Sequence, residues 1–386
     1  MNTKPDSAST SGAIDGSIDG AGKVNDAKKF LAMKAVYSYV FPEVRKIIRD
    51  ISYLPEEFYL TTTPVDVGQA IVDGLSYKKK IIVPKTSDGM INLDEIHVPI
   101  IGRITEEYSQ IVHGLENFRY AYPTAGSSPG IFHILAKLKA DGIDTIYTLD
   151  GEYEGYMEYG LTLGIRTVEV SSLESLLSES KSTKSDIKPG RGVIFISNPS
   201  ARDGNIIEDD LITKVADNGY KIVMDQAYVG LTKNHVYDLS HENIIANVMS
   251  LSKPYGLFRF RIGLTYSREP IESLYANKWF KDVNRLLLGL KAVEDIGPSV
   301  LHKKYSDTHT QIVSQLNADF DLNMSKSDVL LLGNIGVEDA KTLSGPQKGL
   351  IDIYRRGENY RFCLTPYYEL SEKFANEMKS ADKMSA

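Results

Sequence analysis

Cysteine is almost absent from this chain of 386 residues, because only Cys363 occurs. A single cysteine cannot build an internal disulfide framework or a cysteine-ligated zinc site, and we expect no metal. A reducing, cytoplasmic compartment is the natural expectation for such a chain. No apolar run reaches membrane-spanning length. The first residues also lack the basic start and apolar core of a secretory signal peptide, so we expect no membrane partner.

An excess of basic residues is missing as well, since 44 Lys and Arg stand against 51 Asp and Glu, a formal net charge of −7. This mild acidity argues against nucleic acid as the main partner. Hydrophobic residues make up 42% and charged residues 25%, which is ordinary for a globular protein with a sizeable core. The length favours two domains over one.

The N-terminal part changes character along its length. Residues 1–25 are rich in Ser, Gly, Asp and Ala and predict a disordered tail. Within it, Gly16–Lys23 approaches a phosphate-loop pattern, but the spacing is wrong and no strand precedes it. Apolar residues then recur every three or four positions over Asp26–Val40, which predicts a helix that breaks near Pro42. We expect residues 26–60 to form a helical segment that packs with a smaller C-terminal domain.

Short apolar runs alternate with helical patterns in the middle of the chain, which is typical of a mostly parallel sheet flanked by helices. The expected strands are Phe118–Tyr122, Thr145–Leu149, Arg166–Val170, Gly192–Ser197, Lys221–Asp225, Asn247–Ser252 and Ile262–Ser267, with helices at Ile131–Lys139 and Leu211–Asn218. The fold class is therefore α/β, with a large domain over 61–290. The alternation then stops, and residues 291–386 predict a smaller α+β domain with strands at Asp328–Leu332 and Tyr360–Leu364.

The loop Ala125–Gly130 lies between an expected strand and an expected helix. Small residues at a helix start present free N–H groups that suit a phosphate, although a plain turn has the same composition. Gly126–Gly130 also matches G-x-S-x-G, the nucleophile elbow of α/β hydrolases. A hydrolase needs an acid and a histidine downstream, which Asp225 and one of His235, His241 and His302 could supply, so this loop alone leaves both functions open.

Two charged residues end apolar runs, where sites in parallel sheets collect. Asp225 is either a local cap or a counter-ion to a protonated ring nitrogen. Lys253 in such a place is a nucleophilic amine able to form a Schiff base, unless it lies at the surface. Arg259 and Arg261 follow among aromatic and aliphatic residues, and either guanidinium could bind a phosphate through two hydrogen bonds.

The stretch Ser250–Gly263, with the pattern S-x-S-K-x-x-G-x-x-x-x-R-x-G, resembles the lysine signature of class I/II aminotransferases. These are fold-type I enzymes that depend on pyridoxal 5'-phosphate. Asp225–Tyr228 and Gly126–Ser128 fit the same family, and the resemblance extends over roughly Ile96–Leu370. The hydrolase hypothesis explains none of the Ser250–Gly263 pattern and becomes a minor alternative.

The resemblance implies a role for each matching residue. Lys253 would hold pyridoxal phosphate as a Schiff base and shuttle the proton, Asp225 would pair with the pyridine nitrogen, and Tyr228 would donate to the ring hydroxyl. Arg361 would bind the substrate carboxylate, unless it is a surface arginine at a strand edge. The residues that would bind the cofactor phosphate are Ser127, Ser128, Ser250 and Arg261, and Ser252 would also bind the cofactor.

Three positions depart from the family pattern. Tyr153 matches the aromatic residue that stacks on the cofactor ring, but Gly151 stands where a proline is usual. In the Asn-Pro loop that follows the fourth expected strand, Ala201 replaces the asparagine that contacts the ring hydroxyl, so Asn198 is the expected substitute. His97 stands where the partner subunit usually supplies a tyrosine to the phosphate, and it is either a phosphate donor or an ordinary loop histidine.

The resemblance implies a homodimer with shared active sites that acts on a small-molecule amino acid. The leading hypothesis is a pyridoxal-phosphate-dependent aminotransferase. Two alternatives remain on the same scaffold: elimination, cyclisation or oxidation of an amino acid side chain, and a protein that binds the cofactor without catalysis. The intact Lys253 and Asp225 argue against the second of these.

Overall fold

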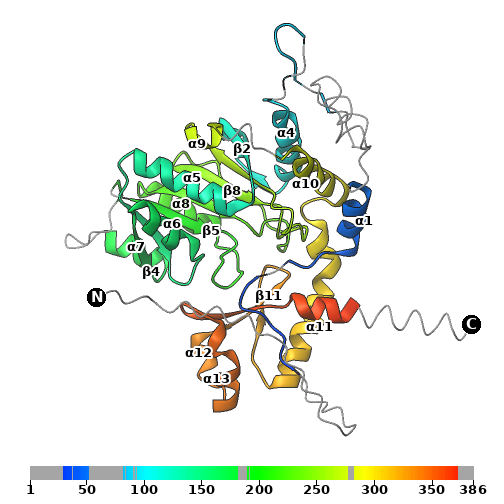
Figure 1. Ribbon diagram of the computed structural model, residues 1–386. Coiled ribbons are helices and arrows are strands. Elements are labelled where there is room, and N and C mark those ends of the chain that lie inside the picture. Colours follow the sequence, from blue (N-terminus) through cyan, green and yellow to red (C-terminus); the bar gives the residue numbers. More distant parts are fainter. Residues whose placement is uncertain are drawn as a thin grey trace, which may run out of the picture. The chain divides into compact units, whose positions relative to one another are not determined.

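A computed structural model describes residues 29–36, 38–51, 81–82, 84–89, 92, 94–180, 189–190, 192–276 and 282–372. The chain divides into two compact units, Met1–Phe30 and Leu31–Ala386. All helices and strands named below belong to the second unit (Figure 1). None of the helices in the described ranges combines the length and the apolar character needed to span a bilayer.

A seven-stranded sheet in the order β2-β9-β8-β6-β5-β3-β4 forms the larger part of this unit. Its strands are β2 (Tyr120–Thr124), β3 (Thr145–Leu149), β4 (Arg166–Val170), β5 (Val193–Ser197), β6 (Lys221–Gln226), β8 (Ile244–Ser250) and β9 (Gly263–Ser267). Only β9 runs against its neighbours β8 and β2, and the other neighbouring pairs are parallel. The predicted mostly parallel sheet is confirmed.

The central strands are apolar without alternation because both faces of the sheet are covered. Every residue of β5 and of β9 is buried. Two helices, α5 (Ser127–Ala140) and α6 (Gly155–Leu163), pack on each other, and α5 also contacts β2, β8 and β9 (Figure 1). The apolar residues of α5 therefore close one face of the sheet directly beside the ends of β2 and β8.

Other helices complete the layers. They are α1 (Pro42–Ile51), α4 (His97–Tyr108), α7 (Leu173–Ser180), α8 (Asp209–Asp217), α9 (Glu272–Ala276) and α10 (Val283–Ile296). The helix α10 begins where the side chain of Asp282 accepts a hydrogen bond from the backbone N–H of Arg285 at 3.0 Å, an ordinary helix cap. It packs on α4 and α1, and α4 packs on β2.

A separate antiparallel sheet forms from the C-terminal part in the order β10-β11-β13-β12. Its strands are β10 (Ser325–Lys326), β11 (Leu332–Gly336), β12 (Arg355–Arg356) and β13 (Asn359–Cys363). The helices α11 (Val300–Phe320), α12 (Val337–Ala340) and α13 (Gly345–Ile351) and the 3-10 turn η3 (Asp352–Tyr354) accompany it. A short parallel pair, β1 (Val112–His113) with β7 (Tyr237–Asp238), and the 3-10 turn η1 (Leu115–Asn117) lie elsewhere in the unit.

The helix predicted over Asp26–Val40 is wrong for the described residues, which are not helical before Pro42. Met33 instead forms an isolated antiparallel bridge with Cys363, and its N–H and C=O both bond to Cys363, at 3.1 and 2.8 Å. This distant partner satisfies the backbone in an extended form, which overrides the helical spacing of the apolar residues. The helix α1 begins at Pro42, a residue well suited to a first helical position.

The strand expected at Asp328–Leu332 begins only at Leu332. The preceding residues are apolar because they are buried in a turn. The N–H of Val329 bonds to the carbonyl of Gly204 at 3.0 Å, and the N–H of Leu330 bonds to the carbonyl of Leu231 at 2.9 Å. The other expected strands match to within a few residues. The domain boundaries at residues 25, 60 and 290 stay predictions.

Candidate active site

A cavity of about 310 Å³ lies at the carboxyl ends of the parallel strands. Its lining comes from segments far apart in the chain, including the start of α5, the ends of β6 and β8, the residues that precede α1, and the strands β12 and β13. The residues that line it are Ala35, Val36, Ser38, Ser127, Ser128, Tyr153, Ser197, Ala201, Asp225, Ala227, Tyr228, Ser250, Ser252, Lys253, Phe258, Arg261, Arg356 and Arg361.

Lys253 enters this cavity just beyond β8, and its side chain is half-buried. The Nζ atom lies 4.0 Å from the centre of the Tyr228 ring, so the amine is held against an aromatic face. Tyr228 itself is buried and follows β6. The structure therefore brings Lys253, Tyr228 and Asp225 together in the lining of one cavity.

Asp225 is buried near the end of β6 with both carboxylate oxygens engaged. The hydroxyl of Tyr156 donates to Oδ2 at 2.9 Å, and the N–H of Ala227 donates to Oδ1 at 3.1 Å. Burial raises the pKa of Asp225, whereas the Lys253 ammonium and the Tyr156 hydrogen bond oppose that rise. A cationic ring nitrogen placed against this carboxylate would favour its charged form in the same way.

The start of α5 forms a cradle with the loop that follows β8. Gly126 has φ +95°, and a Cβ there would lie 2.6 Å from a terminal guanidinium nitrogen of Arg261. Arg261 itself has φ +53°, unusual for a residue with a side chain and typical of ligand-binding turns. The free N–H groups of Ser127 and Ser128 and the positive end of the helix dipole add to this arginine. The cradle fits a phosphate group.

The serines at the end of β8 shape the other side of the cradle. The N–H of Ser252 donates to Oγ of Ser250 at 3.2 Å, and Oγ of Ser252 accepts from the N–H of Ile262 at 3.3 Å. These bonds fold the loop back so that Arg261 reaches the start of α5. Arg259, the other arginine of this stretch, is exposed and does not line the cavity.

Tyr153 lies beside the cradle, and its hydroxyl shares a hydrogen bond of 2.8 Å with the hydroxyl of Ser128. Burial raises the pKa of Tyr153 to about 12, so its hydroxyl stays protonated at neutral pH. Its ring packs edge-on against Tyr156 with centroids 5.5 Å apart. The aromatic position predicted from the sequence therefore borders the same cavity as Lys253.

Two arginines from the smaller sheet complete the cavity. Arg361 on β13 is buried; it donates to the carbonyl of Ala201 and, at 3.0 Å, to the carbonyl of Lys34. Arg356 on β12 is largely buried and lies 3.1 Å from the exposed carboxylate of Glu154. Burial and the nearby Arg361 charge both lower the pKa of Arg356. A second anion in this part of the cavity would stabilise both charges.

Two predicted cofactor residues do not line this cavity. Asn198 is buried, and its side-chain amide is bonded to Ile207 in both directions, donating to the carbonyl at 2.9 Å and accepting from the N–H at 3.0 Å. These hydrogen bonds fix the Asn-Pro loop. They engage the side-chain amide of Asn198, which the sequence analysis predicted to contact the cofactor. Ala201, whose side chain cannot donate, lines the cavity instead.

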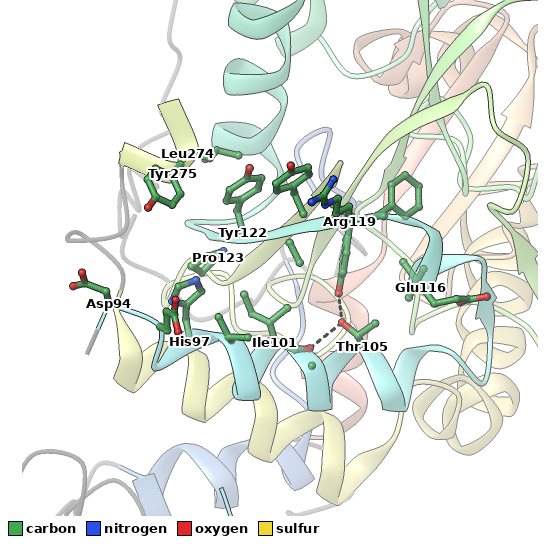
Figure 2. Close-up of a pocket in the computed structure, with 18 of the residues that line it drawn as sticks. Asp94, His97, Ile101, Thr105, Glu116, Arg119, Tyr122, Pro123, Leu274 and Tyr275 are labelled. Carbon is green, nitrogen blue, oxygen red and sulfur yellow. Dashed lines mark hydrogen bonds between the residues drawn. The ribbon is translucent and has the colours of Figure 1, made fainter. Parts of the chain in front are cut away.

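His97 stands at the start of α4 and lines a separate cavity of about 550 Å³. Figure 2 shows it across from Tyr122 and Pro123 of β2, with Tyr275 of α9 near the same opening. The cavity that His97 lines and the cavity that Lys253 lines have no lining residue in common. The predicted contact of His97 with the phosphate stays a prediction.

Three residues at or beside the site were not predicted from the sequence: Tyr156, Arg356 and the buried Glu152. Tyr156 and Glu152 flank Tyr153 in a short stretch that was read only for its ring-stacking aromatic. Arg356 belongs to an arginine pair just before the turn at Gly357, where a surface position is the usual expectation. In the described part of the chain, no cluster of His, Cys, Asp and Glu could hold a metal ion.

Comparison with known proteins agrees with this geometry. Residues 119–325 match the family model described as aminotransferase class I and II, which covers more than half of the chain. The chain belongs to this family. The match includes every cofactor residue predicted above except His97, and it ends before Arg356 and Arg361.

A curated relative in the family is the chloroplastic histidinol-phosphate aminotransferase of Nicotiana plumbaginifolia, 33% identical over 89 residues. That alignment covers 22% of this chain and 21% of the relative, so the matched stretch spans about a fifth of either protein.

Solved structures share the fold at low identity. The aromatic aminotransferase from Pyrococcus horikoshii OT3 is similar with a TM-score of 0.58 and 13% identity, covering 90% of this chain and 94% of that chain. The PLP-bound C-S lyase from Staphylococcus hominis also reaches a TM-score of 0.58, at 10% identity, with 90% of each chain covered. Transferases and lyases thus share this family fold, so the fold alone does not identify the reaction.

Proposed function

We propose that the protein is a pyridoxal-phosphate-dependent aminotransferase that uses Lys253 to hold the cofactor. The observation that carries the proposal is the convergence on one cavity of an amine, a buried carboxylate and a phosphate cradle, contributed by Lys253, Asp225 and the start of α5. These groups match the aldehyde, the ring nitrogen and the phosphate of this cofactor. Membership of the class I and II family supports the same cofactor.

Each of these cavity residues has a separate role in the proposed reaction. Arg261 and the serines at the start of α5 bind the phosphate, and Asp225 keeps the ring nitrogen protonated. Tyr228, whose buried ring lies against the Lys253 amine, donates to the ring hydroxyl. The bound cofactor supplies an electron-withdrawing ring that stabilises negative charge at the substrate α-carbon. Nζ of Lys253 would take the proton from that carbon and deliver it to the former aldehyde carbon of the cofactor, so that the amino group stays with the cofactor.

The basic residues of the cavity that have no role toward the cofactor indicate the substrate class. The cavity is lined by four basic residues and one acidic residue. Arg261 and Asp225 are assigned to the cofactor and Lys253 to proton transfer, so Arg361 and Arg356 remain for the substrate. We propose an amine with two acidic groups or with a phosphate, Arg361 binding the carboxylate where one is present. The relative's name, which denotes a phosphorylated amine, supports this class.

Turnover of a panel of amines tests the proposed function. We expect aspartate, O-phosphoserine and histidinol phosphate to react faster than alanine, leucine or lysine, and only when 2-oxoglutarate is present to accept the amino group. The Arg356→Ala variant should lose most of this preference while still accepting neutral amino acids. Sustained product without an acceptor would replace transamination by elimination or oxidation, and equal rates for all amines would remove the anionic substrate class.

Replacing Arg361 with alanine should raise KM for a carboxylate-bearing substrate about thirtyfold or more, because losing one partner of a buried charge pair costs about 2–5 kcal/mol. The visible absorption of bound cofactor should stay unchanged, since the phosphate cradle is intact. Arg355→Ala is the matched control, because that neighbouring arginine is exposed. An unaltered KM in Arg361→Ala would assign the carboxylate to Arg356.

Three further features belong to the proposal. We propose that the protein is a homodimer with shared active sites, in which His97 reaches the phosphate bound by the partner subunit. We propose a cytoplasmic location, supported by the lone cysteine. The two sheets correspond to a large cofactor domain and a small domain that carries the substrate arginines.

A further inference from the structure

Glu152 is a buried acid that neither the cofactor nor the substrate touches in the scheme above. It follows β3 at the carboxyl edge of the large sheet and is only 3% exposed. Its Oε2 accepts the N–H of Ala201 at 3.0 Å, and its Oε1 accepts the hydroxyl of Ser200. Both bonds reach the Asn-Pro loop, which lies 48 and 49 positions further along the chain.

The same loop forms a hydrogen bond with Arg361, the proposed substrate-binding arginine. The carbonyl of Ala201 accepts a hydrogen bond from Nη1 of Arg361, while Nη2 of Arg361 donates to the carbonyl of Lys34 at 3.0 Å. Ala201 is thus held at its N–H by Glu152 and offers its carbonyl to Arg361. Because Ala201 has no polar side chain, the backbone alone transmits this constraint.

Titratable side chains from several elements lie near Glu152. Arg202 and Asp203 lie on the Asn-Pro loop, Arg356 comes from β12 and Tyr156 from α6. Burial raises the pKa of Glu152 to about 7, and Asp203 adds to that rise, whereas Ser200, Ala201 and Arg202 oppose it. Burying a carboxyl group has an unfavourable free energy that burying an apolar side chain does not have. A carboxyl group kept at this position therefore indicates a functional role.

We infer that Glu152 is a positioning residue: it fixes Ala201 so that the Ala201 carbonyl holds the guanidinium of Arg361 toward the substrate. The inference rests on the proposed role of Arg361. In this role Glu152 needs a side chain long enough to bring an acceptor oxygen to the N–H of Ala201. Glutamine has that length and that oxygen, whereas aspartate is too short. A role in the charge balance of the cavity would require the opposite pattern, with aspartate tolerated and glutamine not.

The test compares Glu152→Gln, Glu152→Asp and Glu152→Ala. In Glu152→Gln the amide oxygen still accepts from Ala201, and the amide NH2 donates to the Ser200 hydroxyl. We expect KM for the best carboxylate-bearing substrate of the amine panel to stay within about twofold of the parent in Glu152→Gln. In Glu152→Asp and Glu152→Ala it should rise about tenfold, with kcat nearly unchanged, because one hydrogen bond to a charged acceptor is lost.

A second readout does not depend on turnover. Calorimetry of the cofactor-free protein with succinate as the probe should show the same order of affinities, with Glu152→Asp about tenfold weaker than Glu152→Gln. Glu294→Gln is the matched control, since Glu294 is equally buried but pairs with Arg103, away from the cavity. That control should bind succinate like the parent. Glu152→Asp keeps the comparison available if Glu152→Ala does not fold.

The outcomes separate the two proposals. If Arg361→Ala weakens succinate binding and Glu152→Asp does not, the positioning role of Glu152 is wrong and the proposed function stands. If Arg361→Ala leaves succinate binding and KM unchanged, the carboxylate role of Arg361 fails first. A Glu152→Gln variant as impaired as Glu152→Ala, or a fall of kcat without a change of KM, would also overturn the positioning role.

Discussion

Replacing Lys253 with alanine should abolish turnover, because no other lysine lines the cavity of the described structure. The amine has two tasks in the proposed function, holding the cofactor covalently and moving the α-proton, and alanine performs neither. Reduction of the loaded parent protein with borohydride should attach the cofactor to the peptide that contains Lys253. The visible absorption of the bound cofactor should shift in the variant, since its aldehyde is no longer attached to the protein.

Two variants separate the amine from its charge and its surroundings. Lys253→Arg keeps a cation near Tyr228 and Asp225 but lacks a nucleophilic amine, so it should be as inactive as Lys253→Ala. Lys233→Ala is the control, because Lys233 is exposed and pairs with Asp328 at 2.8 Å. It should retain both turnover and labelling. Labelled peptide without Lys253, or normal turnover in Lys253→Arg, would refute the assignment.

Replacing Asp225 with alanine should lower kcat by several orders of magnitude while the phosphate cradle still binds the cofactor. Without this buried carboxylate the ring nitrogen loses the anion that keeps it protonated, so the ring withdraws electrons less effectively. Single-turnover measurements with excess enzyme report this step, and absorption of the bound cofactor reports loading. Loss of loading rather than of rate would move Asp225 from catalysis to binding.

A graded control exists at the same carboxylate. Tyr156→Phe removes only the hydrogen bond of 2.9 Å to Oδ2 and leaves the charge and the Ala227 bond. One such bond contributes about 1.5 kcal/mol, so kcat should fall about tenfold, far less than in Asp225→Ala. If both variants had equal effects, the orientation of the carboxylate would matter rather than its charge. Near-normal turnover in Asp225→Ala would refute the ring-nitrogen assignment altogether.

The large sheet and most of its site could be predicted from the sequence because the signals are local. The apolar run Lys221–Asp225 predicts a covered strand that ends in a charged residue, and the structure has β6 there with Asp225 buried. The same logic applies to Lys253 beyond β8. Since parallel strands end at one edge, Asp225 and Lys253 were expected at the same edge of the sheet, and the structure brings them together by placing β6 beside β8.

The N-terminal segment shows where local signals fail. Its apolar spacing suits a helix, yet Met33 pairs with Cys363, a residue 330 positions away. A periodic pattern of apolar residues indicates which side chains are buried. It does not indicate which partner forms hydrogen bonds with the N–H and C=O groups of that segment. Such a partner is decided only when the chain is folded.

The amino-acid sequence by itself determined the mostly parallel sheet, the residues at its strand ends that line the cavity, and the family. Only the tertiary structure decided what Asn198 bonds to, that Arg356 joins Arg361, and that Glu152 holds Ala201. The physical reason is the same in each case. A side-chain amide, guanidinium or carboxylate can bond to many partners of equal chemistry, and the one it meets depends on how segments far apart in the chain pack together.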